Sequence, residues 1–275
     1  MCELLALSTS HPAQLTFSLQ TLAARGGGAG TMHDGWGVAF YQGLDVALFR
    51  EPLCAADSPL VRYLETEGPR TNLAVSHIRH ATQGTVQFSN TQPFIRELGG
   101  RTHVFAHNGN LPGIESNGAM ALGGHYPIGQ TDSEYAFCVL LARLRALWSA
   151  GGAPALESRM SLLALFAADL RTLGPSNFLY ADGDALFVHS HIRRQPGRTH
   201  AAPPGLWILQ RHCAGGSPTV HQAGVATAAE VRDALFIASV PLTGEAWRPL
   251  AEGELIAVRN GSVLICDKPV TAASG

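Results

Sequence analysis

The feature that most constrains this chain is the cysteine at position 2, directly after Met1. Removing Met1 would make Cys2 the N-terminus, so one residue would carry both a thiol nucleophile and a free α-amine that can act as its base. A free thiol titrates near pKa ~8.5 and an α-amine near ~7.7–8.0, so proton transfer between them costs about 1 kcal/mol or less. Taken alone, a cysteine here is more readily explained as a small residue at a tolerant position, and the rest of the sequence reverses that preference.

Composition describes a globular chain and excludes several classes of protein. Of the 275 residues, 46% are apolar and 15% charged, which suits one large domain or two small ones. The net charge of -2 gives no electrostatic reason to expect a nucleic-acid or membrane partner. The five cysteines are an odd number without a CxxC pair, which argues against a disulfide framework and a zinc knuckle. No signal peptide or membrane span is recognisable, so we expect a cytoplasmic protein whose Cys2 stays reduced.

The order of the expected elements favours two sheets over a parallel α/β fold. Strands come first, two consecutive helices lie near the middle, and strands dominate the end, which suits mostly antiparallel sheets with helices outside. Gly26 to Gly30 do not complete a GxGxxG motif, so we reject dinucleotide binding. Helices are expected at 12–25, 58–65, 131–149 and 155–173. Strands are expected at 2–8, 35–42, 45–51, 73–80, 101–107, 176–191 as a hairpin, 206–211, 234–240, and 254–267 around an Asn260-Gly261 turn.

Three further motifs supply the groups that amide cleavage by a thiol requires. Asn108-Gly109, at a strand end, can offer a side-chain amide and an unhindered N–H to an oxyanion. A glutamine substrate would also need an arginine for its α-carboxylate and a carboxylate for its α-ammonium. Arg79 and Asp132 are the candidates. Each has a plainer alternative: a hairpin turn for Asn108-Gly109, a surface ion pair for Arg79, and a helix cap for Asp132.

The histidines at positions 33, 77, 80 and 107 do not favour a metal site. Their spacing matches no helical HxxxH or HExxH pattern, and no acidic pair accompanies them. We therefore expect neither a metal nor a cofactor. The glycines around Trp36 indicate a bend, in which packing is at least as good an explanation as substrate contact.

The motifs together resemble the class II, N-terminal-nucleophile glutamine amidotransferases. Cys2, DGWG, HIRHAT, HNG and GQTDSE occur in the order seen in that family. The stretches MCELLALS, RGGG, TDSEYAFC, NFLYADG and PLTGEAW are similar to its stand-alone bacterial branch. The resemblance runs from Cys2 to about residue 265, so we expect a single domain at 2–265 and a tail at 266–275.

The resemblance implies a fold and a set of roles. The fold would be the four-layer αββα sandwich of Ntn hydrolases. Cys2 would be the nucleophile with its own amine as base, and the Asn108 side chain and Gly109 N–H would form the oxyanion hole. Arg79 would bind the α-carboxylate and Asp132 the α-ammonium, and Thr82 is expected beside them at the substrate.

The chain also departs from the family, which leaves alternatives open. His80 stands where many members have Trp, and Gln83 where many have His, both near the loop expected to cover glutamine. No synthase domain follows, so an ammonia acceptor would come from a separate subunit or from solution. Beside glutamine hydrolysis, the alternatives are hydrolysis of a larger γ-glutamyl amide, a non-catalytic glutamine-binding subunit, and an amidase of the bile-salt or penicillin type.

Overall fold

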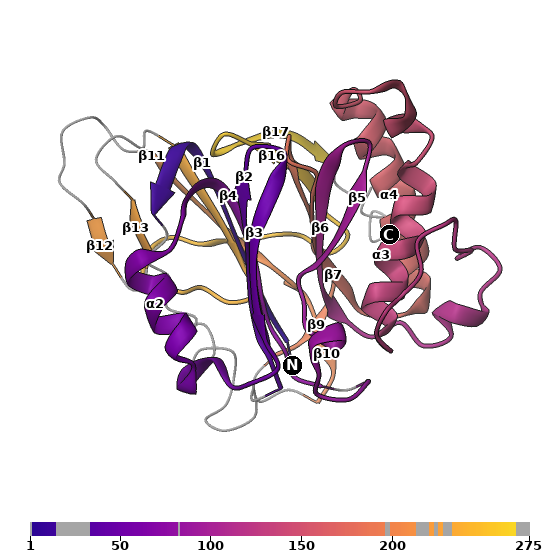
Figure 1. The fold of residues 1–275 in the computed structure, drawn as a ribbon, viewed down its shortest axis with the longest axis horizontal. Coiled ribbons are helices and arrows are strands. Elements are labelled where there is room, and N and C mark those ends of the chain that lie inside the picture. Colours follow the sequence, from indigo (N-terminus) through magenta and orange to yellow (C-terminus); the bar gives the residue numbers. More distant parts are fainter. Residues whose placement is uncertain are drawn as a thin grey trace, which may run out of the picture.

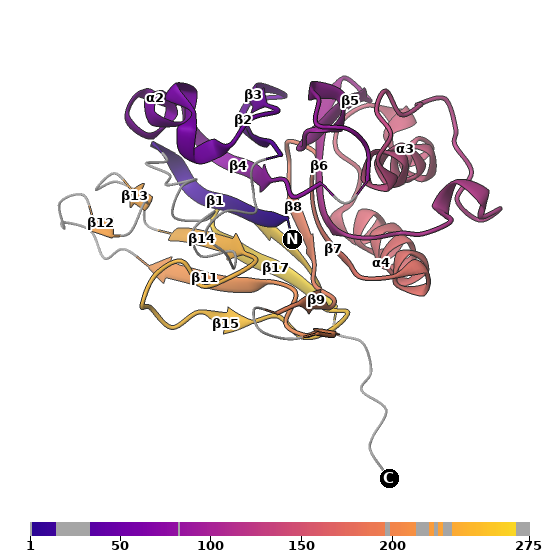
Figure 2. The same ribbon diagram turned by 90° about the horizontal axis from the view of Figure 1, so that it is seen from below.

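Two large antiparallel sheets pack face to face and are covered by helices on both outer sides (Figures 1 and 2). Helix α2 (Pro59–Glu67) covers one sheet, and helices α3 (Asp132–Leu144) and α4 (Leu156–Leu173) cover the other. The chain is thus a four-layer α+β sandwich. This confirms the two antiparallel sheets expected from the order of the elements and the αββα layers that the resemblance implies. The computed structural model describes residues 2–14, 34–81, 83–195, 199–212, 220–222, 225–227 and 233–267.

The first sheet has seven strands, and its neighbours all pair antiparallel. In spatial order they are β15 (Arg248–Pro249), β11 (Trp207–His212), β14 (Asp233–Ala238), β1 (Glu3–Gln14), β4 (Arg70–Ile78), β2 (Trp36–Gln42) and β3 (Asp45–Glu51). The strand that follows Cys2 is therefore central and is paired on both sides.

The second sheet has six strands, again antiparallel. In spatial order they are β17 (Ser262–Asp267), β16 (Leu255–Arg259), β8 (Leu186–His189), β7 (Ser176–Ala181), β6 (Arg101–Gly109) and β5 (Phe94–Leu98). Two small pairs complete the strands: β9 (Arg193–Arg194) with β10 (Ala201–Ala202), and β12 (Val220–Gln222) with β13 (Val225–Thr227).

Alternation of side chains along the strands builds the layers. In β1, Leu5 and Leu7 face the core beneath α2, whereas Leu4 and Ala6 face the core between the sheets. Phe105 of β6 belongs to a third core, beneath α3 and α4. Three apolar cores between four layers account for the burial of strands on both faces.

Local sequence explains how the helices begin. The Ser58 hydroxyl accepts a hydrogen bond from the Val61 N–H at 3.1 Å, and Pro59 occupies the first position of α2. Thr131 caps α3 by accepting from the Glu134 N–H at 3.2 Å. Since Thr131 provides the cap, Asp132 is left as the first residue of the helix. Short 3₁₀ helices lie at Ala55–Asp57, Phe88–Asn90, Ile114–Ser116 and Leu147–Ala150.

Most expected elements are present, and two expectations need correction. The expected helix at 12–25 is wrong at its start, because residues 12–14 continue β1; residues 15–25 lie outside the described part of the chain. Strand β5 was missed, because only five residues carry its pattern within an irregular stretch. The Asn260-Gly261 turn is confirmed, with φ of 51° and 77° at its two residues. No described helix is long and apolar enough to cross a membrane.

The buried His189 predicts a loss of stability in acid. Its Nδ1–H donates to the Ser176 carbonyl at 2.9 Å, and Arg171 donates to its Nε2 at 3.1 Å, so the ring is held neutral. Burial, assisted by the charge of Arg171, lowers the pKa of His189 from 6.5 to about 3. Between these two pKa values the imidazole is protonated in the unfolded chain but not in the folded chain. The contribution of His189 to stability is therefore fully present above pH 6.5 and is lost as the pH falls toward 3.

We expect His189→Asn to flatten the pH dependence of the unfolding free energy by about 2 kcal/mol between pH 7 and pH 5. Urea unfolding at the two pH values measures this change. The exposed His11→Asn variant is the control and should retain the wild-type dependence. An unchanged dependence in His189→Asn would contradict the assignment.

Candidate active site

The strand alternation brings three of the expected site residues to one end of the gap between the sheets. Cys2 precedes Leu4 by two residues and so shares its direction, toward the second sheet. Asn108 follows Ala106 by two residues in β6 and points back from the opposite side. Arg79, just after β4, continues the row of Val75 in that same gap.

The first residues of β1 are held in place by groups that the sequence analysis did not single out. The Leu4 N–H donates to the Ser239 hydroxyl at 2.9 Å, and the Ser239 N–H donates to the Leu4 carbonyl at 3.0 Å. Glu3, fully buried, pairs with the equally buried Arg193 at 2.6 Å. Arg193 also donates to the Ser239 carbonyl at 2.7 Å. These contacts fix the strand immediately after Cys2.

The sulfur of Cys2 lies against the backbone that follows Arg79. The His80 N–H donates to Sγ at 3.3 Å, and the Cys2 thiol lies 3.4 Å from the His80 carbonyl. Burial raises the pKa of the Cys2 thiol, while the His80 N–H and the positive charge of Arg79 oppose that rise. The thiol is therefore mainly protonated at neutral pH and needs a base before it can act as a nucleophile.

Asn108 connects the second sheet to the residue that carries the thiol. Its side-chain amide donates to the Cys2 carbonyl at 2.6 Å, and the amide of Asn177 donates to the Asn108 carbonyl at 3.1 Å. A Cβ at position 109 would lie 1.9 Å from the Pro175 carbonyl oxygen, so only glycine fits there. The hairpin-turn interpretation is wrong, because β6 pairs with β5 and with β7, and residues 110–175 separate it from β7.

Arg79 organises the loop that follows it. The Arg79 side chain is buried. Its guanidinium donates to the backbone carbonyls of Gln83 at 2.8 Å, Gly84 at 3.1 Å and Thr85 at 3.1 Å. The backbone carbonyl of Asp34 lies farther away, at 3.5 Å. It has no carboxylate partner within 4.0 Å among the residues described. The surface-ion-pair interpretation is therefore wrong.

The DGWG stretch braces the same loop from the other side. The Asp34 carboxylate accepts from the Ala81 N–H at 2.8 Å and lies 3.8 Å from His80 Nδ1. The Arg79 N–H donates to the Gly35 carbonyl at 2.8 Å. Trp36 is fully buried in the core beneath α2, which confirms a packing role for it. Thr82 and His33, both singled out in the sequence, lie outside the described residues.

Asp132 lines an open pocket of about 340 Å³. One carboxylate oxygen accepts from the Leu111 N–H at 2.7 Å, and the other accepts from the Ser133 N–H at 2.7 Å. Gln83 reaches this pocket from the Arg79 loop and donates to the Asn110 side chain at 3.3 Å. Cys2, Arg79 and Asn108 do not line it. The remaining lining residues are Leu111, Gly113, Ile114, Glu115 and Ser116.

Two buried histidines flank the site and are held neutral. Burial lowers the pKa of His77 to about 3 and that of His107 to about 4, and the charge of Arg79 adds to the effect on His77. His107 Nδ1 lies 2.9 Å from the Ser133 hydroxyl. Within the described ranges, no group of three or more His, Cys, Asp or Glu side chains is placed to hold a metal ion.

The structure thus gathers most, but not all, of the expected residues. Cys2 contacts Asn108 and the backbone of His80, which follows Arg79, and Asp132 is tied to Leu111 in the segment that follows Gly109. The sequence analysis missed the residues that position this group: Glu3, Asn177, Arg193 and Ser239. Asn177 begins the NFLYADG stretch, so that motif carried a usable signal, whereas the Glu3–Arg193 pair spans 190 residues of sequence.

Comparison with known proteins agrees with this arrangement. A family model described as class II glutamine amidotransferases matches residues 1–274. YafJ of Escherichia coli K12, named provisionally as a glutamine amidotransferase, is 34% identical over 263 residues, covering 92% of this chain and 96% of YafJ. A crystal structure described as a predicted glutamine amidotransferase from Pseudomonas aeruginosa superposes with a TM-score of 0.68 at 32% identity, covering 96% of this chain and 100% of that one.

A more distant structure shares the fold alone. Glutamine phosphoribosylpyrophosphate amidotransferase of Bacillus subtilis superposes with a TM-score of 0.55 at 16% identity, covering 97% of this chain but 49% of that one. The family model matches nearly the whole of this chain, and the alignment with YafJ spans nearly the whole of both proteins. The chain therefore belongs to the class II glutamine amidotransferases, a family of enzymes that act on C–N bonds.

Proposed function

We propose that this protein, once Met1 is removed, hydrolyses the side-chain amide of glutamine through a glutamyl thioester on Cys2. The observation that carries the proposal is the position of Cys2. It directly precedes the central strand β1, and the Asn108 side-chain amide of the opposite sheet donates to the Cys2 carbonyl at 2.6 Å. That contact places the Asn108 amide beside the residue that carries the thiol, where it can serve an oxyanion.

The chemistry follows from a raised thiol pKa beside a free amine. The α-amine of Cys2 takes the thiol proton, and the thiolate attacks the amide carbon of glutamine. The tetrahedral intermediate collapses, its C–N bond breaks, and the leaving nitrogen takes the proton from the α-ammonium, so that ammonia departs. Water then attacks the thioester, which releases glutamate and restores the thiol. Retained Met1 would block the amine, so the processed chain is the active form.

Asn108 and Gly109 are suited to stabilise the oxyanion. A primary amide has two N–H donors, and the bond to the Cys2 carbonyl uses one of them. The second donor is then available next to the nucleophile, where negative charge develops. The lack of a Cβ at Gly109 matters because Pro175 already fills the space that any larger residue would need.

Asp132 and Arg79 are suited to hold the α-ammonium and α-carboxylate of glutamine. Each Asp132 oxygen accepts one backbone N–H, and an ionised carboxylate has about four acceptor sites in total, so it can take an ammonium as well. Both terminal nitrogens of Arg79 donate to backbone carbonyls of the loop. A substrate carboxylate therefore displaces some of them.

The ammonia released has no acceptor assigned within this chain. We propose that it is either released or passed to an acceptor bound to a separate subunit, in keeping with the expectation of a stand-alone glutaminase domain. The pocket of about 340 Å³ at Asp132 is large enough for the glutamyl head group, which glutamine shares with γ-glutamyl amides.

Replacing the nucleophile tests the proposal. Cys2→Ala should lower glutamate release from glutamine by about 10³-fold or more. Wild-type protein quenched with acid should show a glutamyl adduct by mass spectrometry, and its N-terminal mass should lack Met1. Cys54→Ala, which removes another partly exposed free thiol, is the matched control and should retain activity. Equal rates in Cys2→Ala and wild type would rule out the proposal.

Asp132→Asn tests recognition of the α-ammonium. We expect kcat/KM for glutamine to fall about ten- to hundredfold, because a charge-assisted hydrogen bond contributes roughly 1.5–3 kcal/mol. Glutaramate, which is glutamine without the α-amine, should be affected far less by the same substitution. Glu115→Gln removes a second carboxylate from the same pocket and serves as the control. A parallel loss with both substrates would show that Asp132 acts only on the fold.

Substrate size is tested by comparing glutamine with γ-glutamyl peptides. We expect a preference for free glutamine, because the chain belongs to the class II glutamine amidotransferases. Measuring kcat/KM for glutamine and for γ-glutamylglycine on the same preparation decides the point. Faster cleavage of the peptide would favour the γ-glutamyl amide hydrolase.

A further inference from the structure

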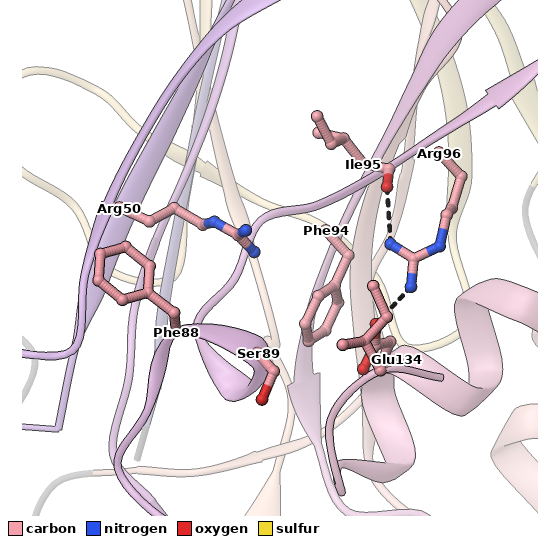
Figure 3. Close-up of a pocket in the computed structure, with 8 residues that line it drawn as sticks. Arg50, Phe88, Ser89, Phe94, Ile95, Arg96 and Glu134 are labelled. Atoms are coloured by element: carbon pink, nitrogen blue, oxygen red, sulfur yellow. Dashed lines mark hydrogen bonds and ion pairs between the residues drawn. The ribbon is translucent and has the colours of Figure 1, made fainter. Parts of the chain in front are cut away.

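A second pocket lies where the edge strands of the two sheets face each other. Strand β3 ends the first sheet, strand β5 ends the second, and the 3₁₀ turn Phe88–Asn90 lies beside the opening between them (Figure 3). The pocket has a volume of about 290 Å³ and shares no lining residue with the pocket at Asp132. Its lining comprises Arg50, Phe88, Ser89, Phe94, Ile95, Arg96, Ile128 and Glu134.

Arg50 brings an uncompensated positive charge into this pocket. Arg50 of β3 pairs with Gly37 of β2, and the Arg50 side chain passes over this glycine. A Cβ added at Gly37 would lie 2.7 Å from Arg50 Cγ. One terminal nitrogen donates to the Thr91 carbonyl at 2.8 Å, and no carboxylate within the described residues lies within 4.0 Å of it. Burial lowers the pKa of Arg50. A partly desolvated guanidinium that keeps unused N–H donors is a ready anchor for an anion.

The only acidic group lining the pocket is already neutralised. One Glu134 oxygen accepts from Arg96, and the other accepts from the Gly129 N–H at 2.7 Å. Figure 3 shows the Arg96–Glu134 pair on one side and the Arg50 guanidinium on the other. Two guanidiniums and one carboxylate leave the lining with a net charge of +1, and that charge resides on Arg50.

The rest of the lining is apolar. Phe94 is buried, whereas Phe88 and Ile128 at the rim are 56% and 76% exposed. Large apolar side chains beside a guanidinium suit a ligand that has an anionic end and an apolar body. The apolar side chains would not stabilise a bound metal ion or a polyanion.

We propose that this pocket is a second ligand site, for a small carboxylate with an aromatic or branched aliphatic body. The carboxylate binds Arg50, and the body lies between Phe88 and Ile128. The site goes beyond the proposed glutamine hydrolysis and does not depend on it. It also adjoins the Arg79 loop, since the Asn90 amide of the neighbouring turn donates to the Thr85 carbonyl at 2.9 Å.

Binding of benzoate, measured by calorimetry and ligand-observed NMR on the full chain, tests the site. We expect saturable binding that excess glutamine does not displace. Arg50→Met, which keeps the stem and removes the charge, should weaken benzoate about tenfold or more and leave neutral benzamide unchanged. Arg62→Met, on α2 and outside the pocket, is the matched control and should bind benzoate as wild type does.

Substitution of Ile128 at the rim provides a second, independent test that leaves the protein core unchanged. Ile128 is mostly exposed, so Ile128→Glu and Ile128→Lys should both fold. The glutamate should weaken benzoate binding and the lysine should strengthen it, because the carboxylate enters past this position. Absence of saturable benzoate binding, displacement by glutamine, or equal affinity in wild type and Arg50→Met would each overturn the proposal.

Discussion

The hydrogen bond between the Asn108 amide and the Cys2 carbonyl is the contact on which the site depends, because it joins the two sheets at the residue that carries the thiol. It exists only if both strands present the correct face. A slip of one residue in β1 would turn Cys2 away from the second sheet. The two bonds between Leu4 and Ser239 oppose such a slip, and the pairing of β1 with β4 on its other side adds to them.

The Glu3–Arg193 pair has a similar effect at a higher energetic cost. Burial raises the pKa of Glu3 to about 7, although Arg193 opposes that rise, so ionisation of this carboxyl is not favoured by its surroundings as a whole. Buried pairs of this kind often add little net stability, whereas loss of one partner costs roughly 3–5 kcal/mol. The pair therefore contributes more to a unique strand register beside Cys2 than to the free energy of unfolding.

The sequence sufficed for features that depend on short-range pattern. Period-two apolar runs predicted most strands, Ser58-Pro59 predicted the start of α2, and Asn260-Gly261 predicted its turn. The residues that position the nucleophile were missed, because Ser239 and Arg193 become its neighbours only through strand pairing across about 190 to 240 residues. Family resemblance supplied the roles expected of Arg79 and Asp132, but no pattern indicated that loop carbonyls would surround the guanidinium.

Those carbonyls give Arg79 two competing uses. Its terminal nitrogens bind neutral oxygens of Gln83, Gly84 and Thr85, which holds the loop closed on the guanidinium. Charge-assisted bonds to a carboxylate are roughly twice as strong as bonds between neutral groups, so a substrate carboxylate can displace part of this set. The Asn90 amide donates to the Thr85 carbonyl of the same loop. Movement of the loop on displacement of these carbonyls would therefore be confined to the residues between Arg79 and Asn90. In the role proposed for Arg79, binding of an amino-acid head group and rearrangement of this loop would thus be a single event.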